Sequence, residues 1–250
     1  MKIVDAIILA GSAGPTALTE AEMVDNKAFI RIRERTMLQH VYGALKRAAG
    51  VGRIAVVGPQ DKIKACLEGQ DVLVVPEGKT IVENVERGFK ALQPEGYFLV
   101  CSADIPFLTP EAVDELILAC KPFTADFYYP IVERSDNDKR FPGVKRTYVR
   151  LAEGEFTGGN IILVNPACLK KALPRLERVF ALRKSPLKLT SLLGFTFLVK
   201  LFFRRLTIKE LEKRFAELFA VTGKAVISRY PEIGTDVDKL SDLALARRLL

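Results

Sequence analysis

Short apolar runs alternate with longer amphipathic stretches over the first half of the chain. The apolar runs, which favour buried β-strands, cover residues 4–9, 53–58, 71–75 and 97–101. The stretches with helical spacing of apolar residues follow them at 36–49, 61–68, 80–92 and 109–119. Buried strands that alternate with helices predict an α/β protein with a mostly parallel sheet covered by helices on both faces.

The second half of the chain has a less regular pattern. Strands are predicted at 126–132, 144–151, 160–164 and 225–228, with a charged loop at 133–143. Helical spacing covers 166–176, helix-forming residues dominate 177–222, and a closing helix is predicted at 240–250. No linker rich in Gly, Pro or Ser divides the chain. We therefore expect one domain over residues 1–250, with a basic, mostly helical elaboration at about 170–222.

Composition places the chain among globular proteins. It has 250 residues, 49% of them hydrophobic and 27% charged, which is enough to bury a sizeable core. The opening apolar run is too short for the hydrophobic region of a secretory signal, so we expect a cytoplasmic protein. None of the four cysteines is in a CxxC pair and there is a single histidine, so a zinc cluster is not expected.

Positive charge is concentrated in one segment. Residues 170–215 carry thirteen Lys or Arg and three Glu, a net charge of +10, whereas the whole chain carries +8. Such charge attracts phosphates, nucleic acid or anionic lipid without choosing between them. Within the segment, residues 192–203 are apolar apart from Lys200 and are too short to span a bilayer. They predict either a buried helix or peripheral membrane contact through residues 184–205.

Small residues directly follow the first predicted strand. The sequence Leu9-Ala10-Gly11-Ser12-Ala13-Gly14 would let backbone N–H groups approach a phosphate or a base closely. An ordinary strand-to-loop turn is the alternative. A second turn, Gly78-Lys79-Thr80, resembles the end of a P-loop, but Leu73 occupies the position of that motif's first glycine. A turn whose amides face a ligand remains the interpretation of that segment.

Three further segments carry candidate chemistry. Asp104 follows a buried strand, where its carboxylate would enter the ligand crevice of an α/β sheet and suit Mg²⁺, although a turn-forming Asp is the alternative. Gly158, Gly159 and Asn160 precede a strand and allow close backbone approach or a hairpin-like turn. Asp236 or Asp238, just before the last helix, would supply a second metal oxygen or cap that helix. The single histidine, His40, is interpreted as structural or solvated and not as a general base.

Together these residues resemble the nucleotidyltransferase family that includes molybdenum cofactor guanylyltransferase and other MobA-like NTP transferases. The resemblance rests on Leu9 to Gly14, on Lys27 within Asn26-Lys27-Ala28-Phe29, on Ala103-Asp104-Ile105-Pro106, on Gly158-Gly159-Asn160 and on Asp236-Val237-Asp238. It implies a GT-A-like, Rossmann-like three-layer α/β/α fold with a mostly parallel mixed sheet. It also implies an acceptor held by Gly158, Gly159 and Asn160. It implies Mg²⁺ held by Asp104 and Asp236, and catalytic roles for Lys27 and Asp104. The implied nucleotide-binding residues are Leu9, Ala10, Gly11, Ser12, Gly14, Lys27, Gly58 and Gly78.

Two positions depart from the family pattern. Ser12 stands where the family has a second glycine, and Thr16 stands where it has an arginine that helps expel pyrophosphate. The loop from 15 to 25 is also long and acidic. Another basic residue must replace that arginine, or catalysis is weakened.

The resemblance implies transfer of a nucleoside monophosphate from an NTP, with GTP or CTP the expected donor, and release of pyrophosphate. The acceptor would be a small phosphorylated, hydroxyl-bearing or lipid-linked compound, and no nucleic-acid partner is expected. A GT-A-type glycosyltransferase using a nucleotide-sugar is an alternative, although Ala103-Asp104 lacks the usual DxD. A non-catalytic, membrane-associated nucleotide-binding module is the other.

Overall fold

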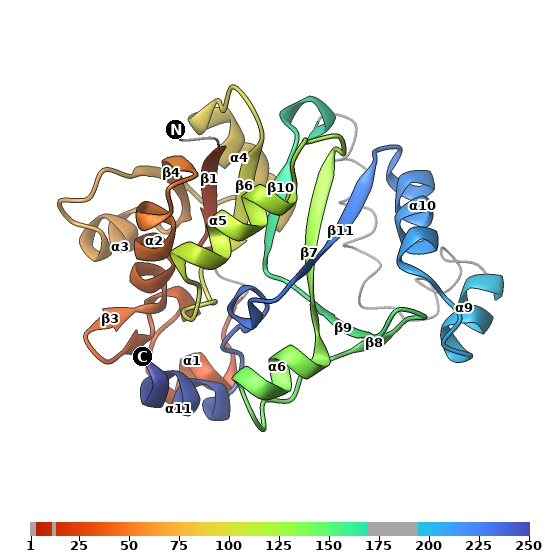
Figure 1. The fold of residues 1–250 in the computed structure, drawn as a ribbon. Coiled ribbons are helices and arrows are strands. Elements are labelled where there is room, and N and C mark those ends of the chain that lie inside the picture. The colour runs from red at the N-terminus through yellow and green to blue at the C-terminus, as the bar shows by residue number, and fades with distance from the viewer. Residues whose placement is uncertain (1–3, 12–13, 170–194) are drawn as a thin grey trace.

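A central mixed β-sheet organises the protein in the computed structural model, which describes residues 4–11, 14–169 and 195–250 (Figure 1). Nine described strands form this sheet in the order β5-β4-β1-β6-β10-β7-β9-β8, with β11 on the other edge of β7. The strands are β1 (Val4–Leu9), β4 (Val51–Gly58), β5 (Leu73–Pro76), β6 (Phe98–Ser102), β7 (Phe127–Glu133), β8 (Val149–Arg150), β9 (Glu155–Gly158), β10 (Ile161–Val164) and β11 (Gly223–Ser228). A separate hairpin joins β2 (Arg31–Ile32) and β3 (Arg35–Thr36).

Most strands of the sheet run in one direction. The pairs β5–β4, β4–β1, β1–β6 and β7–β11 are parallel. Strands β10 and β9 pair antiparallel with their neighbours and are the two that run the other way. The prediction of a mostly parallel mixed sheet is therefore confirmed, and the carboxyl ends of β1, β4 and β6 meet at one edge, where ligands bind in such sheets.

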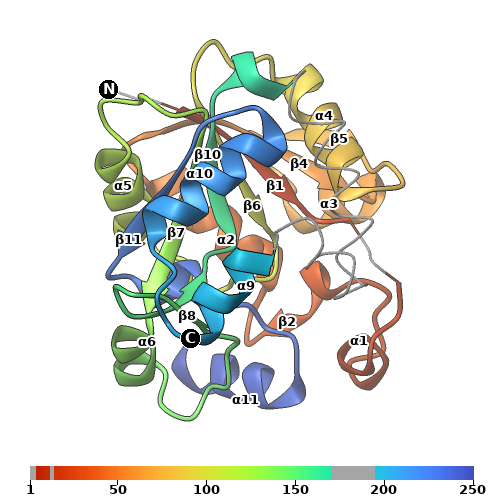
Figure 2. The ribbon, with the colours of Figure 1, turned by 90° about the vertical axis from the view of Figure 1, so that its right-hand side faces the viewer.

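Helices cover both faces, as the alternation of buried residues along the strands requires. On one face, Ile8 and Leu99 pack beneath α2 (Met37–Arg47) and α5 (Pro110–Ala119). On the other, Ile7 and Val100 pack beneath α4 (Ile81–Leu92) and α10 (Ile208–Phe219) (Figure 2). The remaining described helices are α1 (Ala17–Ala21), α3 (Gln60–Cys66), α6 (Arg134–Arg140), α9 (Phe195–Phe202), α11 (Leu240–Leu249) and the 3₁₀ turns η1 (Lys27–Phe29), η2 (Pro166–Cys168) and η3 (Pro231–Ile233). The three-layer prediction is confirmed.

The stretch between β7 and β10 differs from its prediction. The segment 133–143, expected to be a loop, contains helix α6. An ion pair between Arg134 and Asp138, one turn apart, stabilises this helix. The expected strand at 144–151 is reduced to β8, and residues 155–158 form the unpredicted strand β9. Both strands are short: β9 pairs with the distant β7, and β8 pairs only with β9, so their partners and not a local apolar pattern define them.

The basic elaboration is described only in part. Of the helical spacing predicted at 166–176, the described portion is η2, and residues 170–194 lie outside the described residues. The later portion of the 170–222 segment forms α9 and α10, as its helix-forming composition predicts. Among the described residues, no helix is long and apolar enough to span a bilayer.

Candidate active site

The loop after β6 places Asp104 at the carboxyl edge of the sheet. The N–H of Ala103 donates to the carbonyl of Leu9 over 3.1 Å, which ties this loop to the end of β1. The carbonyl of Asp104 in turn accepts a hydrogen bond from the N–H of Val237 over 2.9 Å. That bond brings the segment before α11 across 133 positions of sequence to the end of β6. Asp104 thus sits where two loops of distant origin meet.

Two more aspartates, Asp236 and Asp238, reach the same place because side-chain direction alternates along extended backbone. The side chain of Val237 is fully buried in the core beneath α11. In extended backbone, its neighbours Asp236 and Asp238 project the other way. The preceding turn is fixed by the hydroxyl of Thr235, which donates to the carbonyl of Pro231 over 2.8 Å.

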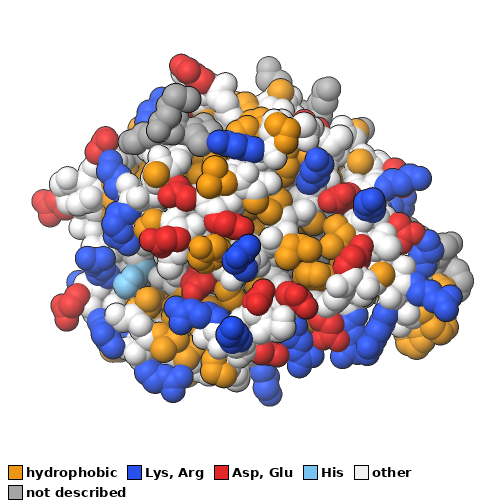
Figure 3. Space-filling view, viewed as in Figure 1, with side chains coloured by type: hydrophobic (Ala, Val, Ile, Leu, Met, Phe, Trp, Pro, Cys, Tyr) orange, Lys and Arg blue, Asp and Glu red, His pale blue; other side chains and the backbone are white. Residues whose placement is uncertain are grey.

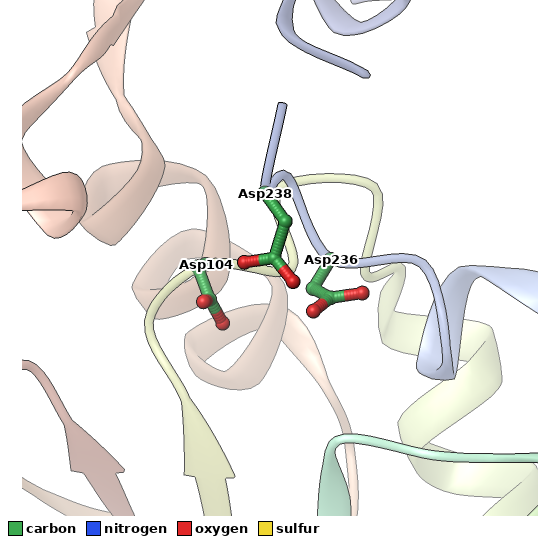
Figure 4. Close-up of side chains that lie close together, drawn as sticks. All are labelled: Asp104, Asp236 and Asp238. Atoms are coloured by element: carbon green, nitrogen blue, oxygen red, sulfur yellow. The ribbon is translucent and has the colours of Figure 1, made fainter. Parts of the chain in front are cut away.

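The carboxylates of Asp104, Asp236 and Asp238 form one cluster (Figure 4). Each offers an oxygen, and these oxygens lie within 4.8 Å of one another. The sequence prediction paired Asp104 with Asp236, and the structure places Asp238 beside them. Three carboxylates this close repel one another unless cations neutralise them.

Lys27 is one of these cations. Its Nζ donates to Asp104 Oδ2 over 2.7 Å and to Asp238 Oδ1 over 2.5 Å. Burial alone would lower the pKa of Lys27, but the two carboxylates outweigh burial and raise that pKa above its ordinary value. Burial also works against the ionised form of Asp238, yet the hydrogen bond from Lys27 keeps the pKa of Asp238 below its usual range.

The position of Lys27 is set by its neighbour Asn26. The Asn26 Oδ1 accepts from the N–H of Ala28 over 2.8 Å and so caps η1. Its Nδ2 donates to the carbonyl of Ala10 over 2.7 Å in a buried setting. One side chain therefore joins the turn that carries Lys27 to the small-residue loop after β1.

Arg146 is the second cation of the cluster. Its guanidinium forms an ion pair with the carboxylate of Asp236, and both side chains are mostly buried. Burial raises the pKa of Asp236, and Arg146 opposes that rise. The Nε of Arg146 is buried and makes no hydrogen bond to the described residues. Sequence reasoning missed this residue, which lay unmarked among basic residues of a predicted strand.

The cluster has the donor chemistry of a magnesium site. Mg²⁺ takes hard oxygen ligands, which lie about 4 Å apart when they face each other across an octahedral ion. The observed limit of 4.8 Å between oxygens therefore needs only small side-chain movements. The hydroxyl of Ser102, two residues before Asp104, is a further oxygen that is buried without a hydrogen-bond partner among the described residues. Asp104, Asp236 and Asp238 fit as the residues that would hold the ion.

The predicted nucleotide-binding loops meet beside this cluster. A Cβ on Gly11 would lie 2.8 Å from Asn84 Nδ2 and 2.8 Å from Glu77 Oε2, and the N–H of Gly78 donates to Asn84 Oδ1 over 2.5 Å. A Cβ on Gly58 would lie 2.8 Å from the carbonyl oxygen of Ala10. Gly58 is therefore needed for its loop to approach the backbone of the first loop, and Gly11 leaves room for the side chains of Asn84 and Glu77. Asn84, which sequence reasoning missed, binds the Gly78 loop and lies against Gly11 of the first loop.

Ser12 and Gly14, two predicted nucleotide-binding residues, and Thr16 follow Gly11 in the loop after β1. Ser12 lies outside the described residues. Gly14 is exposed, with a φ of +99° that favours glycine. Thr16 caps helix α1, its hydroxyl accepting from the N–H of Thr19 over 3.2 Å. The position where the related family has an arginine is thus occupied by a helix cap.

The Gly158–Asn160 segment lies on the other side of Asp104. It bridges β9 and β10, which pair with successive parts of β7. The carbonyl of Asn160 accepts from the N–H of Ser102 over 3.0 Å, and the N–H of Asn160 donates to the carbonyl of Ile233 over 2.9 Å. A Cβ on Gly158 would collide with the hydroxyl of Tyr129. The glycines are needed for packing, and the Asn160 side chain makes no hydrogen bond within the described part of the chain.

Helix α2 carries the single histidine away from this cluster. His40 Nε2 lies 3.5 Å from the carbonyl oxygen of Ile32, and burial lowers the pKa of the ring. The same helix lines one side of a surface hollow of about 310 Å³, bordered also by Cys66 and Leu67 of the α3 region. That hollow shares no residue with the aspartate cluster. The structure supports the interpretation of His40 as a structural residue.

Comparison with known families gives a match over most of the chain. Residues 6–193 match the MobA-like NTP transferase domain. A stretch of 105 residues is 33% identical to 2-C-methyl-D-erythritol 4-phosphate cytidylyltransferase of Streptomyces coelicolor. That stretch spans 38% of this chain and 39% of the relative's length.

Comparison with solved structures extends the likeness to the whole fold. A structure described as a hypothetical transferase from Thermus thermophilus is 41% identical, with a TM-score of 0.86 over 97% of this chain and 100% of the other. The 4-diphosphocytidyl-2C-methyl-D-erythritol synthase of Anaerococcus prevotii has a TM-score of 0.60 at 17% identity, over 99% of this chain and 95% of the other. CMP:2-keto-3-deoxy-manno-octonic acid synthetase, in complex with CTP, has a TM-score of 0.59 at 15% identity, over 100% and 98%. The last two show the shared GT-A-like fold alone.

Proposed function

The chain belongs to the MobA-like NTP transferase family, and from this premise we propose that it is an enzyme that transfers a nucleoside monophosphate from an NTP to an acceptor and releases pyrophosphate. The observation that carries the proposal is the joint position of three carboxylates, Lys27 and a glycine-lined loop at the carboxyl edge of one sheet. Such transfer needs positioning and charge neutralisation more than a covalent protein group. The site offers both positioning and charge neutralisation.

Each part of the site receives a role in the proposal. The loop at Gly11, with Gly58 and Gly78, accommodates the nucleotide by close backbone approach. Asp104, Asp236 and Asp238 hold Mg²⁺, which supplies charge neutralisation at the triphosphate when bound. Lys27 is then free to donate to phosphate oxygens.

Arg146 provides the cation that the first loop lacks. Its guanidinium forms an ion pair with Asp236 in the cluster that also contains Lys27, whereas Thr16 caps α1. A guanidinium can bind phosphate oxygens through two parallel N–H groups, so it suits stabilisation of departing pyrophosphate. In this proposal, the Arg146 guanidinium leaves the Asp236 carboxylate and binds phosphate oxygens when nucleotide and metal bind.

The donor in the proposal is CTP, with GTP the alternative. The name of the 33%-identical relative specifies a cytidylyl group, while the guanylyl group belongs to the family resemblance.

The acceptor is a phosphorylated or hydroxyl-bearing compound, small or lipid-linked, placed against Gly158, Gly159 and Asn160. Peripheral membrane contact within 184–205 would suit a lipid-linked acceptor, and residues 184–194 of that segment lie outside the described residues.

The test is a thermal-shift screen of the four NTPs with Mg²⁺, followed by pyrophosphate detection with each NTP that stabilises the protein. We expect CTP, or GTP as the alternative, to stabilise it and to release pyrophosphate with a phosphorylated or hydroxyl-bearing acceptor. Asp104→Asn should abolish turnover with the fold intact, and Asp71→Asn, at a carboxylate that is 99% exposed, should not change it. Stabilisation without pyrophosphate for any acceptor would establish a nucleotide-binding module instead, and turnover of a nucleotide-sugar alone would establish a glycosyltransferase.

A further inference from the structure

Helix α9 ends at Phe202, and both Phe202 and the next residue, Phe203, face solvent. Phe202 is 82% exposed and Phe203 is 63% exposed, and their rings meet edge to face with centroids 5.3 Å apart. Val199, one turn before Phe203, is also exposed. Figure 3 shows an apolar area at the lower right, where α9 lies in Figure 1, beside Lys and Arg side chains. Exposed aromatic residues that adjoin each other mark an interaction surface more often than isolated ones do.

The core does not need these phenylalanines. The inner side of α9 packs through Phe197 and Leu201 against a small cluster of buried residues, Leu151, Phe156 and Leu206. Those contacts fix the helix on the β8–β9 hairpin and the start of α10. The outward side chains are therefore additional to the packing that holds α9 in place.

Cations border the phenylalanines directly. Arg204 and Arg205 follow Phe203 and are exposed, and Lys209 is exposed on the first turn of α10. We name Val199, Phe202, Phe203, Arg204 and Arg205 the α9 patch.

The carboxylates near this patch are largely engaged. Glu210 pairs with Lys200, and Glu155, which faces Arg204, pairs with Arg134 and Arg150. Arg205 forms no ion pair with any described residue, so the surface around the phenylalanines stays positive.

The chemistry of the α9 patch selects one partner among several. Apolar side chains beside arginines match the boundary of an anionic bilayer, where rings enter the acyl region and guanidinium groups remain at the phosphates. A second copy of this chain fits poorly, because a two-fold contact would place Arg204 and Arg205 against the same arginines.

We propose that the α9 patch docks this protein on the surface of an anionic lipid bilayer. Phe202 and Phe203 enter the headgroup–acyl boundary, and Arg204 and Arg205 bind lipid phosphates. The proposal is independent of nucleotidyl transfer, since no residue of the patch belongs to the aspartate cluster. It would place a lipid-linked acceptor and the enzyme on the same surface.

The experiment is vesicle co-sedimentation of the full chain without nucleotide. Phosphatidylcholine vesicles containing about one-third phosphatidylserine are compared with vesicles of phosphatidylcholine alone. We expect stronger partition to the anionic vesicles and its decrease as salt rises. R204Q/R205Q should weaken partition by about 25-fold, at about fivefold for each arginine. F202S/F203S should weaken it by about tenfold or more.

The matched control is Ile227→Ser, which removes an apolar side chain that is 56% exposed on β11 and should leave partition unchanged. Because the patch residues are exposed, the variants should melt as the wild type does, which a thermal scan checks. Failure of the wild-type chain to bind anionic vesicles, or undiminished binding by F202S/F203S, would overturn the proposal. It would be overturned equally if light scattering showed a dimer that F202S/F203S dissociates, with no vesicle binding.

Discussion

Replacing Lys27 with methionine tests the electrostatic coupling in the aspartate cluster. The change keeps the length and apolar stem of the side chain and removes the ammonium that joins Asp104 to Asp238. Three carboxylates then face one another with Arg146 as the remaining cation among the described residues. We expect the variant to be less stable than the wild type in metal-free buffer near neutral pH.

The size of the loss follows from the exposure of the partners. The side chains of Lys27 and Asp104 are 25% and 20% exposed, so their hydrogen bond is worth about 2 kcal/mol. Asp238 is 53% exposed, and solvent screening makes its contribution small. A loss of about 2 kcal/mol lowers the melting temperature of a chain this long by roughly 4–8 °C.

The pH dependence has a definite sign. The pKa of Lys27 is raised in the folded state, so its stabilisation is present below the ordinary value of 10.5 and is lost as pH rises through the folded pKa. The pKa of Asp238 is lowered, so its stabilisation is present above the ordinary value of 3.8 and is lost as pH falls through the folded pKa. The difference between Lys27→Met and the wild type should therefore shrink in acid, as pH falls through the folded pKa of Asp238, and in alkali, as pH rises through the folded pKa of Lys27.

The assay is thermal unfolding followed by circular dichroism, in EDTA and in a series of MgCl₂ concentrations. Mg²⁺ should raise the melting temperature of Lys27→Met more than that of the wild type, since the ammonium no longer competes for the carboxylates. Lys46→Met is the control, because the partner of Lys46, Asp71, is fully solvated and that pair is worth little. Equal melting temperatures for Lys27→Met and the wild type in EDTA would refute the reasoning.

Two further substitutions test the loops around the cluster. Gly58→Ala places a Cβ against the Ala10 carbonyl and should destabilise the protein by about 1–3 kcal/mol in urea unfolding, whereas Gly96→Ala, where a Cβ meets open space, should not. Asn26→Ala removes the hydrogen bond to Ala10 and the cap of η1, so it should cost about 1–2 kcal/mol and weaken NTP binding measured by calorimetry; unchanged affinity would show that the loop holds its position without Asn26.

The sequence contained enough information to predict the sheet edge at which the site lies. Apolar runs marked β1, β4 and β6, because strands buried on both faces have few polar positions, and a shorter apolar run marked the partly exposed edge strand β5. The position of Asp104 at the end of β6 then followed from chain order. Its meeting with Asp236 was predicted through the family resemblance, and the structure supplies the physical cause, a backbone hydrogen bond between Val237 and Asp104.

Contacts between distant, irregular segments were not predictable. Arg146 reaches Asp236 across 90 positions from a stretch without regular structure, and no local pattern separates it from other basic residues. The same reason explains the misjudged segment at 133–151, where α6 is a short, charged helix and β8 takes its partner from β9. Apolar periodicity reports burial along one element, and these features depend on which elements meet.

The charges of the cluster indicate how the binding of metal and the binding of nucleotide would affect each other. Three carboxylates, Lys27 and Arg146 leave a formal charge of −1, which a divalent ion would turn to +1. A site with surplus positive charge attracts a triphosphate, whereas the same site without the ion keeps its cations engaged with aspartates. Binding of Mg²⁺ would thus release Lys27 and Arg146 from the carboxylates at the moment when phosphate oxygens need them. Metal and NTP should therefore bind with positive cooperativity, because each neutralises the charge that the other leaves unpaired.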